Sequence, residues 1–208
     1  MQNIKKIVLT GGPCGGKTTA LSYISEELKK MGVKVFQVPE IATMFISGGV
    51  ADIVNISQTD YGKYLEIEKG MISAQIALEK EFYNLSNIFK DERRVIIFDR
   101  GIMDMAAYMP KEHFEKIISE IGLDAEGIFG NYDGVIHLVT AADGAESFYT
   151  TKNNKARAES SVEEARLADK RTLEVWAGHP HLKIIDNSTD FENKMQRLMN
   201  EIIELIRL

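Results

Sequence analysis

Short apolar segments alternate along the chain with longer segments whose apolar residues recur at helical spacing. The short segments are rich in β-branched residues and end at glycine, proline or polar residues, a pattern typical of buried strands. RVIIFD at 94–99 is nearly all apolar, which predicts a central strand covered on both faces. The predicted strands are 5–10, 33–39, 94–99, 134–140 and 182–187.

Single apolar stripes predict the first and last helices. The stripe in 17–31 is followed by Gly32, a common helix stop. The end of the chain predicts an amphipathic helix, and ordinary packing on a core explains its stripe better than a membrane surface does. The stripe of this last helix consists of Met195, Leu198, Met199, Ile202 and Ile206.

The middle of the chain is less regular. Ser57 and Asp60 have the spacing of a capping box, which predicts a long helix from there to about Phe89. Gly62 and Gly70 are potential breaks in this helix.

Three other segments are predicted from weaker patterns. Residues 41–56 predict a short helix followed by a loop, and 101–122 predict helix with a break at Pro110. The polar stretch 141–160 has the composition of a mobile loop. A helix over 162–177 follows, because serines three residues before glutamates open it and a glycine closes it.

Strands that alternate with helices predict an α/β fold of three layers, with a five-stranded parallel sheet between helices. The 208 residues, of which 44% are hydrophobic, suit a single domain over 1–208. In such folds the site lies beyond the carboxyl ends of the strands.

Composition narrows the classes of function. The net charge of −6 argues against a broad nucleic-acid surface. The single cysteine excludes an intramolecular disulfide framework and an all-cysteine zinc site. No apolar run suits a signal peptide or a membrane helix, so we expect a cytoplasmic protein without a membrane span.

The strongest motif follows the first strand and opens the first helix. Gly11, Gly16, Lys17 and Thr18 satisfy G-x-x-x-x-G-K-[ST], the P-loop pattern. Backbone N–H groups would wrap a polyphosphate, Lys17 would neutralise the β- and γ-oxygens, and the Thr18 hydroxyl would ligate Mg²⁺. The predicted nucleotide-binding residues are Gly11, Gly12, Pro13, Cys14, Gly15, Gly16, Lys17, Thr18 and Thr19.

Acidic residues that end two other strands are candidates for catalysis. Asp99 resembles a Walker B carboxylate that would hold Mg²⁺ with Thr18, although it could instead cap the next helix. Its neighbour Arg100 would contact a phosphate or a substrate group, or form an ordinary salt bridge. Glu40 stands where a general base for a substrate hydroxyl would lie, and helix capping is the alternative.

Basic residues on the helix at 162–177 suggest a lid. Arg166 and Lys170 are four apart and project from one face, where they could close over the γ-phosphate within a lid region of about 141–178. Favourable interaction with the helix dipole explains the same charges. The loop before this helix would add Lys155 and Arg157.

Two further features have structural explanations. Cys14 near a helix amino end could be a reactive thiol, but a small filler residue is the favoured explanation. His179 and His181 could be a metal pair, but no acidic or cysteine ligand lies near them in the sequence.

Other classes of P-loop protein fit less well. A guanine-reading N-K-x-D lacks its aspartate in the nearest string, 154–157, so ATP is the expected nucleotide and GTP is not excluded. A ring-forming motor or a helicase would need further domains and motifs, for which 208 residues leave little room.

The strings TGGPCGGKTT, VPE, FDRG and EARLADKRTLEVWAGHPHLKIIDNS together resemble compact AAA-type ATP-binding domains grouped near ribosylnicotinamide kinase and other nucleoside and nucleotide kinases. In deoxynucleoside kinases a glutamate after the second strand acts as base and an acid–arginine pair follows the third. Glu40 and the pair Asp99–Arg100 match those positions. The resemblance also implies a base-facing loop near Asn187. The stretch 45–64 matches no known substrate signature, which leaves the acceptor unidentified.

The expected function is therefore phosphoryl transfer from ATP with Mg²⁺ to a small-molecule acceptor, and the oligomeric state is left open. The alternative is a regulatory ATPase or GTPase module without an acceptor. An enclosed pocket beside Glu40 would favour the kinase, and open solvent there would favour the module.

Overall fold

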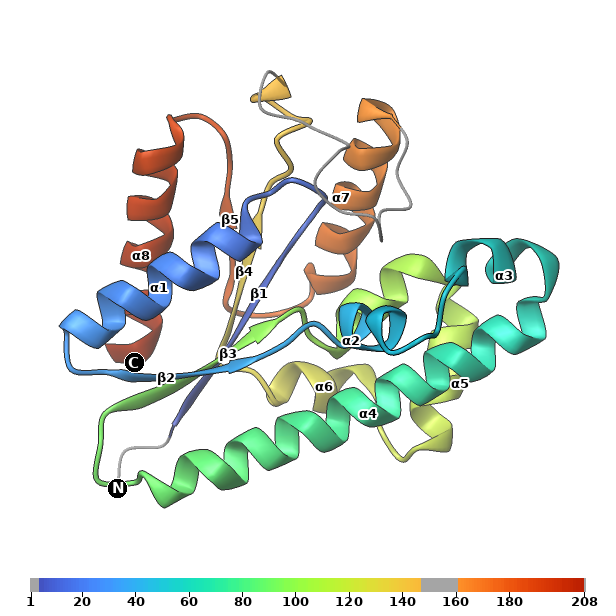
Figure 1. The fold of residues 1–208 in the computed structure, drawn as a ribbon, viewed down its shortest axis with the longest axis horizontal. Coiled ribbons are helices and arrows are strands. Elements are labelled where there is room, and N and C mark those ends of the chain that lie inside the picture. Colours follow the sequence, from blue (N-terminus) through green and yellow to red (C-terminus); the bar gives the residue numbers. More distant parts are fainter. Residues whose placement is uncertain (1–3, 147–160, 208) are drawn as a thin grey trace.

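The computed structural model describes residues 4–146 and 161–207. Its strands form one parallel sheet in the order β2-β3-β1-β4-β5 (Figure 1). The strand directions, the number of strands and the positions of all five confirm the predicted sheet. The strands are β1 (Lys5–Gly11), β2 (Lys34–Val38), β3 (Arg94–Asp99), β4 (Gly134–Leu138) and β5 (Leu182–Ile185).

The middle strand is β1, not β3. It pairs with β3 on one side and with β4 on the other, so the prediction that 94–99 is central was wrong by one place. Both strands are almost fully buried, which explains why their sequences look alike. The position of β1 places the loop that follows it in the middle of the sheet's carboxyl edge.

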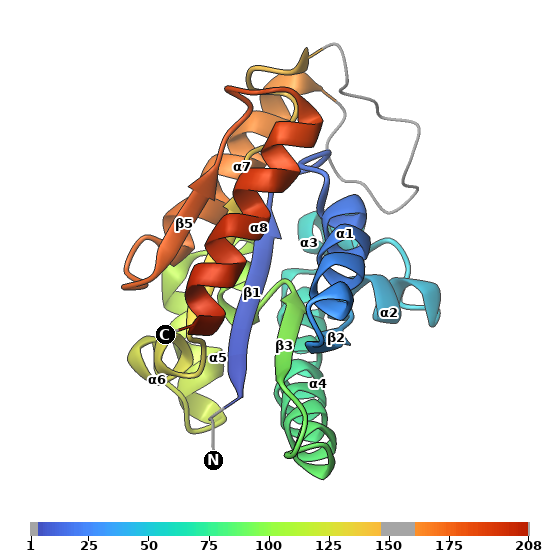
Figure 2. The same ribbon diagram turned by 90° about the vertical axis from the view of Figure 1, so that its left-hand side faces the viewer.

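Helices cover both faces of the sheet, which confirms three layers (Figures 1 and 2). One face is packed by α1 (Lys17–Lys30) and α8 (Phe191–Arg207). The other carries the long α4 together with α7 and the short 3₁₀ helix η1. Its helices are α2 (Ile41–Ser47), α3 (Ile53–Thr59), α4 (Tyr61–Ile88), η1 (Ile102–Tyr108), α5 (Lys111–Glu120), α6 (Ala125–Gly130) and α7 (Val162–Trp176).

Alternate residues of each strand divide the core in two. On β1, Ile7 and Leu9 pack with α1 and α8, whereas Val8 packs with α4 and α7. This division follows from the period of two in a strand. The predicted stripe of α8 is buried as expected except that Leu205 is buried and Ile206 only half-buried. None of the described helices combines the length and apolar composition that crossing a bilayer requires.

The long helix differs from its prediction at its start. Ser57 lies inside α3, and the cap of α4 is Asp60, whose carboxylate accepts a hydrogen bond from the Lys63 amide at 3.0 Å. The helix continues through Gly62 and Gly70, because its buried face packs on the sheet and compensates for two weak helix formers.

Three other segments are corrected or completed. Residues 41–56 contain two helices where one and a loop were predicted, and Pro110 separates η1 from α5 as expected. Helix α6 was not predicted; it is only six residues long and begins at an Asp124 cap. The Ser161 hydroxyl caps α7, which confirms the predicted helix start. Most of the predicted mobile loop, with Lys155 and Arg157, lies outside the described residues.

Candidate functional site

The P-loop connects β1 to α1 at the carboxyl edge of the sheet. Gly16 adopts a left-handed conformation with φ of 90° directly before the first helical residue, Lys17. At Gly11 a Cβ would lie 2.1 Å from the Leu138 carbonyl oxygen, so the loop can leave β1 here only with glycine. The Lys17 ammonium donates to the Gly11 carbonyl at 3.2 Å and so curls back over the loop.

The start of the P-loop is held by hydrogen bonds to α7 and to the connection after β4. The Gly12 amide donates to Asp169 Oδ1 of α7 at 2.7 Å, and the Thr140 hydroxyl donates to the Pro13 carbonyl. Asp169 is buried and also accepts from His137 Nε2 and the Thr140 amide. Gly11 and Gly12 therefore form the base of the loop, while the part from Pro13 to Thr19 lines the pocket.

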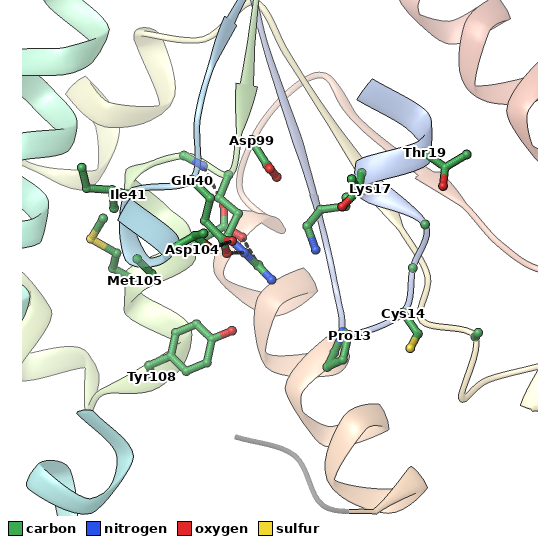
Figure 3. Close-up of a pocket in the computed structure, with 18 of the residues that line it drawn as sticks. Pro13, Cys14, Lys17, Thr19, Glu40, Ile41, Asp99, Asp104, Met105 and Tyr108 are labelled. Carbon is green, nitrogen blue, oxygen red and sulfur yellow. Dashed lines mark hydrogen bonds and ion pairs between the residues drawn. The ribbon is translucent and has the colours of Figure 1, made fainter. Parts of the chain in front are cut away.

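One pocket of about 990 Å³ runs from the P-loop to the far side of the sheet edge (Figure 3). Its near end is formed by the loop and the amino end of α1, where N–H groups and the helix dipole favour an anion. Its far end is lined by α2, α3, α4 and η1 and is mainly apolar. Residues at the far end include Ile41, Ile46, Ile53, Tyr64, Met71 and Met105.

A network of ion pairs lies between the two ends of the pocket. Arg100 Nε donates to Glu40 Oε1 at 2.6 Å, and Thr43 donates to the other carboxylate oxygen at 2.6 Å. Arg100 has a φ of 71°, uncommon for a residue with a side chain, and its amide donates to the Leu9 carbonyl at 3.1 Å. The salt-bridge alternative for Arg100 is thus present, and it places the guanidinium beside Glu40 in the pocket wall.

Asp104 completes this network and was not predicted. It is 2% exposed and accepts hydrogen bonds from the Arg100 guanidinium at 3.1 Å and the Trp176 indole at 3.1 Å. The Thr10 hydroxyl and the Gly101 amide donate to it as well. Four donors on one buried carboxylate hold Arg100, and through it Glu40, in one orientation. The only sequence signal was an acid three residues after a glycine that starts a helix.

Asp99 and Lys17 face the same space from different elements (Figure 3). Within the described residues, Asp99 Oδ1 is buried and accepts no hydrogen bond. Burial and the nearby Glu40 carboxylate raise the pKa of Asp99. Burial and the Arg100 guanidinium lower the pKa of Lys17 to about 8. Burial thus disfavours the charged form of both groups, a pattern that is common where an ionic ligand binds.

The carboxylate of Asp99 and the hydroxyl of Thr18 fit a magnesium ion. Both side chains line the pocket, and the unpartnered Asp99 oxygen is the kind of hard donor that Mg²⁺ prefers. In the part of the chain that the structure describes, no three histidine, cysteine or acidic side chains gather as a metal site. Magnesium in phosphoryl-transfer sites needs no such group, because substrate phosphates and waters supply most of its ligands.

A family model described as an AAA domain matches residues 6–194. The chain belongs to the AAA domain family. The match covers the P-loop, the Glu40 network, α7 and the first turn of α8, and it confirms the resemblance noted in the sequence. A search of the curated proteins found no match for this AAA domain.

Solved structures share the fold of this AAA domain. A deoxyadenosine kinase from M. mycoides with bound dCTP has a TM-score of 0.60 and 16% identity, with 96% of this chain and 99% of that chain covered. The same kinase with products dCMP and dCDP has a TM-score of 0.60 and 18% identity, with 96% of this chain and 99% of that chain covered. With bound dATP the kinase has a TM-score of 0.60 and 19% identity, with 95% of this chain and 99% of that chain covered. The AAA domain thus has a nucleoside-kinase-like P-loop fold.

The structure does not bring the two predicted lid cations to the pocket of the AAA domain. Arg166 Nε donates to the Ala142 carbonyl at 2.6 Å, and the guanidinium pairs with Glu146 at 2.7 Å. Lys170 points to solvent and lies 3.8 Å from Glu174. In this conformation the two cations stabilise a loop and a helix, and their role over a γ-phosphate stays a prediction.

Asn187 and Cys14 do line the pocket. The Asn187 amide donates to the carbonyls of Thr140 and Asp143 at 2.8 and 2.6 Å, so it holds a neighbouring loop. Cys14 adopts a φ of 57° within the P-loop. Contact of either side chain with a nucleotide base or phosphate stays a prediction.

His179, one of the two histidines considered as a metal pair, is a structural residue. His179 is 4% exposed, and its Nε2 lies 3.1 Å from the Tyr132 carbonyl oxygen. Its Nδ1 accepts a hydrogen bond from the His181 amide at 3.1 Å. With both ring nitrogens engaged, His179 has no free lone pair for a metal.

The far end of the pocket contains an acid of unusual character. Glu68 on α4 is 4% exposed, and burial raises its pKa to about 7, although a hydrogen bond with Tyr64 lowers it. Gln75, two turns further along α4, donates to the buried Glu79 at 2.8 Å. Tyr64, Glu68 and Gln75 line this otherwise apolar wall, as polar groups do in a small-molecule site.

Glu68→Gln is expected to remove a pH dependence of stability. Glu68 keeps its proton in the folded protein up to a pH of about 7, while an unfolded glutamate loses it near 4.5, so this group makes the fold less stable as the pH rises between those values. At pH 8 the variant should be more stable by on the order of 2 kcal/mol, or about 5 °C in Tm.

Thermal unfolding from pH 4 to 9 measures this effect. The Tm difference between variant and wild type should vanish near the acid end of the range. Glu66→Gln, at an exposed position of the same helix, is the matched control. A constant difference at every pH would contradict the raised pKa of Glu68.

Proposed function

We propose that this AAA domain is a phosphotransferase of the nucleoside-kinase type. It transfers the γ-phosphate of ATP, bound with Mg²⁺ at the P-loop, to a hydroxyl of a small-molecule acceptor at the far end of the pocket. The observation that carries the proposal is one continuous pocket of about 990 Å³, which joins the P-loop to Glu40 and to a second, mainly apolar end. This volume is at the upper end of the ~300–1,000 Å³ of small-molecule sites, as two ligands require.

The pocket favours a kinase over a regulatory module. Glu40 is held by Arg100 and Thr43 within the wall of the pocket, and its side chain is only 26% exposed. A switch that signals to another protein needs no apolar chamber behind its phosphate site. The convergence of Tyr64, Glu68 and Gln75 in that chamber supports a bound acceptor.

Lys17, Thr18 and Asp99 would hold the donor. The Lys17 ammonium would leave the Gly11 carbonyl and contact the β- and γ-phosphates. The Thr18 hydroxyl and the unpartnered Asp99 oxygen would hold magnesium. When bound, the ion neutralises phosphate charge and aligns the leaving group.

Glu40 would receive the proton of the acceptor hydroxyl. Burial raises the pKa of Glu40, but the Arg100 and Lys17 cations bring it below its ordinary value, so the carboxylate is ionised at neutral pH. As the acceptor oxygen bonds to the γ-phosphorus, the bond from that phosphorus to the bridging oxygen breaks and ADP leaves. Arg100 would keep the carboxylate aimed at the hydroxyl and offset the negative charge of the transferring group.

A nucleoside is the acceptor class that we propose. The structures of similar fold are those of deoxyadenosine kinase with bound dCTP, with dCMP and dCDP, and with dATP. A flat base would suit the apolar walls formed by Ile41, Met71 and Met105, and polar groups on α4 would meet its edge or its sugar.

An acceptor panel tests the function directly. The protein with ATP and Mg²⁺ is incubated with nucleosides, nucleotides and ribosylated vitamins in turn, and ADP release is measured. We expect at least one nucleoside to raise ADP release about a hundredfold or more above the rate without acceptor, because a positioned hydroxyl replaces water as the nucleophile. A nucleotide-bound protein whose slow hydrolysis no acceptor accelerates would be a regulatory module instead.

A further inference from the structure

A lysine lies on the buried side of the last helix. Lys194 is in the first turn of α8 and is only 3% exposed, although it precedes Leu198 and Ile202 at four-residue spacing on the face that packs on the sheet. Lysine is rarely buried without a paired charge, because removing an ammonium from water costs several kcal/mol. Lys194 also lines the nucleotide end of the pocket, so its burial there requires a reason.

The ammonium joins three separate segments around the P-loop. It donates to the Val139 carbonyl at 2.9 Å, to Asn187 Oδ1 at 2.6 Å and to the Gly15 carbonyl at 3.4 Å. These acceptors belong to the connection after β4, the connection after β5 and the P-loop itself. All three N–H bonds of the ammonium are thus directed at neutral oxygens.

These contacts fix the orientation of the Asn187 side-chain amide and of the Gly15 carbonyl. Because Asn187 Oδ1 receives Lys194, its amide nitrogen is left to donate to the carbonyls of Thr140 and Asp143. The Gly15 carbonyl turned toward α8 cannot turn toward the pocket. The amide of Gly16 belongs to the same peptide group and points opposite to that carbonyl, so it is directed away from α8 and is available to an anion.

The charge of Lys194 has no ion-pair partner within the described residues. Burial lowers its pKa to about 8, Asp169 and Asp186 raise it from a distance, and Arg197 lowers it. A positive charge without an ion-pair partner, placed beside a phosphate-binding loop, raises the potential inside that loop, where the dielectric is low.

We propose that Lys194 is a positioning residue of the nucleotide site. It holds the Gly15 carbonyl away from the ligand, ties the P-loop to the two neighbouring connections, and supplies a buried positive charge that a polyphosphate compensates. This role rests on the proposed binding of ATP at the P-loop and adds a second cation, from the opposite end of the chain, to Lys17.

Isothermal titration with Mg·ATP, Mg·ADP and adenosine tests the role. Lys194→Met keeps the length of the side chain but removes its donors and its charge. We expect the Kd of Mg·ATP to rise about tenfold to a hundredfold, the Kd of Mg·ADP to rise less, and the Kd of adenosine to change less than twofold. A purely structural lysine would weaken all three ligands alike.

Two further variants complete the test. Lys183→Met is the matched control, because Lys183 lies on β5, pairs with Glu201 at 2.9 Å and does not line the pocket. It should bind Mg·ATP as the wild type does. Lys194→Arg keeps the charge and should retain affinity for Mg·ATP to within about fivefold. Lys194→Arg also tests the proposal if Lys194→Met fails to fold. A folded Lys194→Arg variant whose Kd for Mg·ATP is a hundredfold higher than that of the wild type would overturn the role of the charge.

The outcomes separate this inference from the proposed function. Wild-type protein that binds no Mg·ATP would refute the nucleotide site as a whole. Wild-type protein that binds Mg·ATP, together with a Lys194→Met variant of equal affinity, would refute the role of Lys194 alone.

Discussion

Lys17→Ala is expected to lower kcat/KM for ATP by about a thousandfold or more, the largest loss of any single change in the pocket. The Lys17 side chain is half-buried, and its pKa is lowered to about 8 by burial and Arg100, so binding of the phosphates would stabilise its charged form. The variant also removes the hydrogen bond to the Gly11 carbonyl. Affinity for Mg·ATP and acceptor-dependent ADP release measure the loss.

The control for this change is Lys29→Ala. Lys29 lies on the exposed face of the last turn of α1, outside the pocket, and its loss should leave both measurements within about twofold. Unchanged turnover in Lys17→Ala would remove the P-loop from the reaction.

Glu40→Gln is expected to lower kcat by about a hundredfold to ten-thousandfold while the Kd of Mg·ATP changes less than threefold. Glutamine keeps the shape of the side chain and one acceptor for Arg100, but it cannot take a proton from the acceptor hydroxyl. The division between kcat and Kd distinguishes a base from a residue that binds the donor. Single-turnover kinetics with a nucleoside identified in the panel would measure it.

The Glu40 variant needs a check on folding, because it weakens a half-buried ion pair with Arg100. Thermal unfolding of Glu40→Gln and of Glu66→Gln, an exposed change of the same chemistry, provides that check. If a fully folded Glu40→Gln retained the kcat of the wild type, Glu40 would be a structural residue and another group, or water, would accept the proton.

The P-loop and the strands were predictable because their signals are local. Gly11, Gly16, Lys17 and Thr18 lie within eight consecutive residues between a strand and a helix, so the motif carries its own geometry. The strands can be recognised by their apolar composition, because helices cover both faces of the sheet. Element boundaries failed where competing caps were near, as at Ser57 and Asp60.

The partners of the site residues were not predictable. Asp104, Asp169 and Lys194 contact the first strand or the loop after it from about 90 to 180 residues away in the chain. The only local signal of such a residue is a polar side chain at a position that the apolar pattern of the sequence predicts to be buried. Lys194, four residues from Leu198 on an apolar stripe, was the one case where that signal was visible.

The orientation of α7 shows why a correct helix did not place its cations. Spacing alone set Arg166 and Lys170 on a common face of this helix. The packed face consists of Ala165, Asp169, Thr172 and Trp176, so the cations point aside toward Glu146 and Glu174. Which face packs depends on the sheet and η1 that α7 meets.

By itself the sequence determined that this chain forms a parallel sheet with a phosphate-binding loop, since the spacing of glycines, a lysine and apolar runs encodes short-range geometry. The tertiary structure alone decided that Glu40, Arg100 and Asp104 form one network, that Asp99 faces Lys17 across a shared pocket, and that Lys194 contacts the loop. Those arrangements come from strand order and helix packing, which bring together side chains that no local pattern connects.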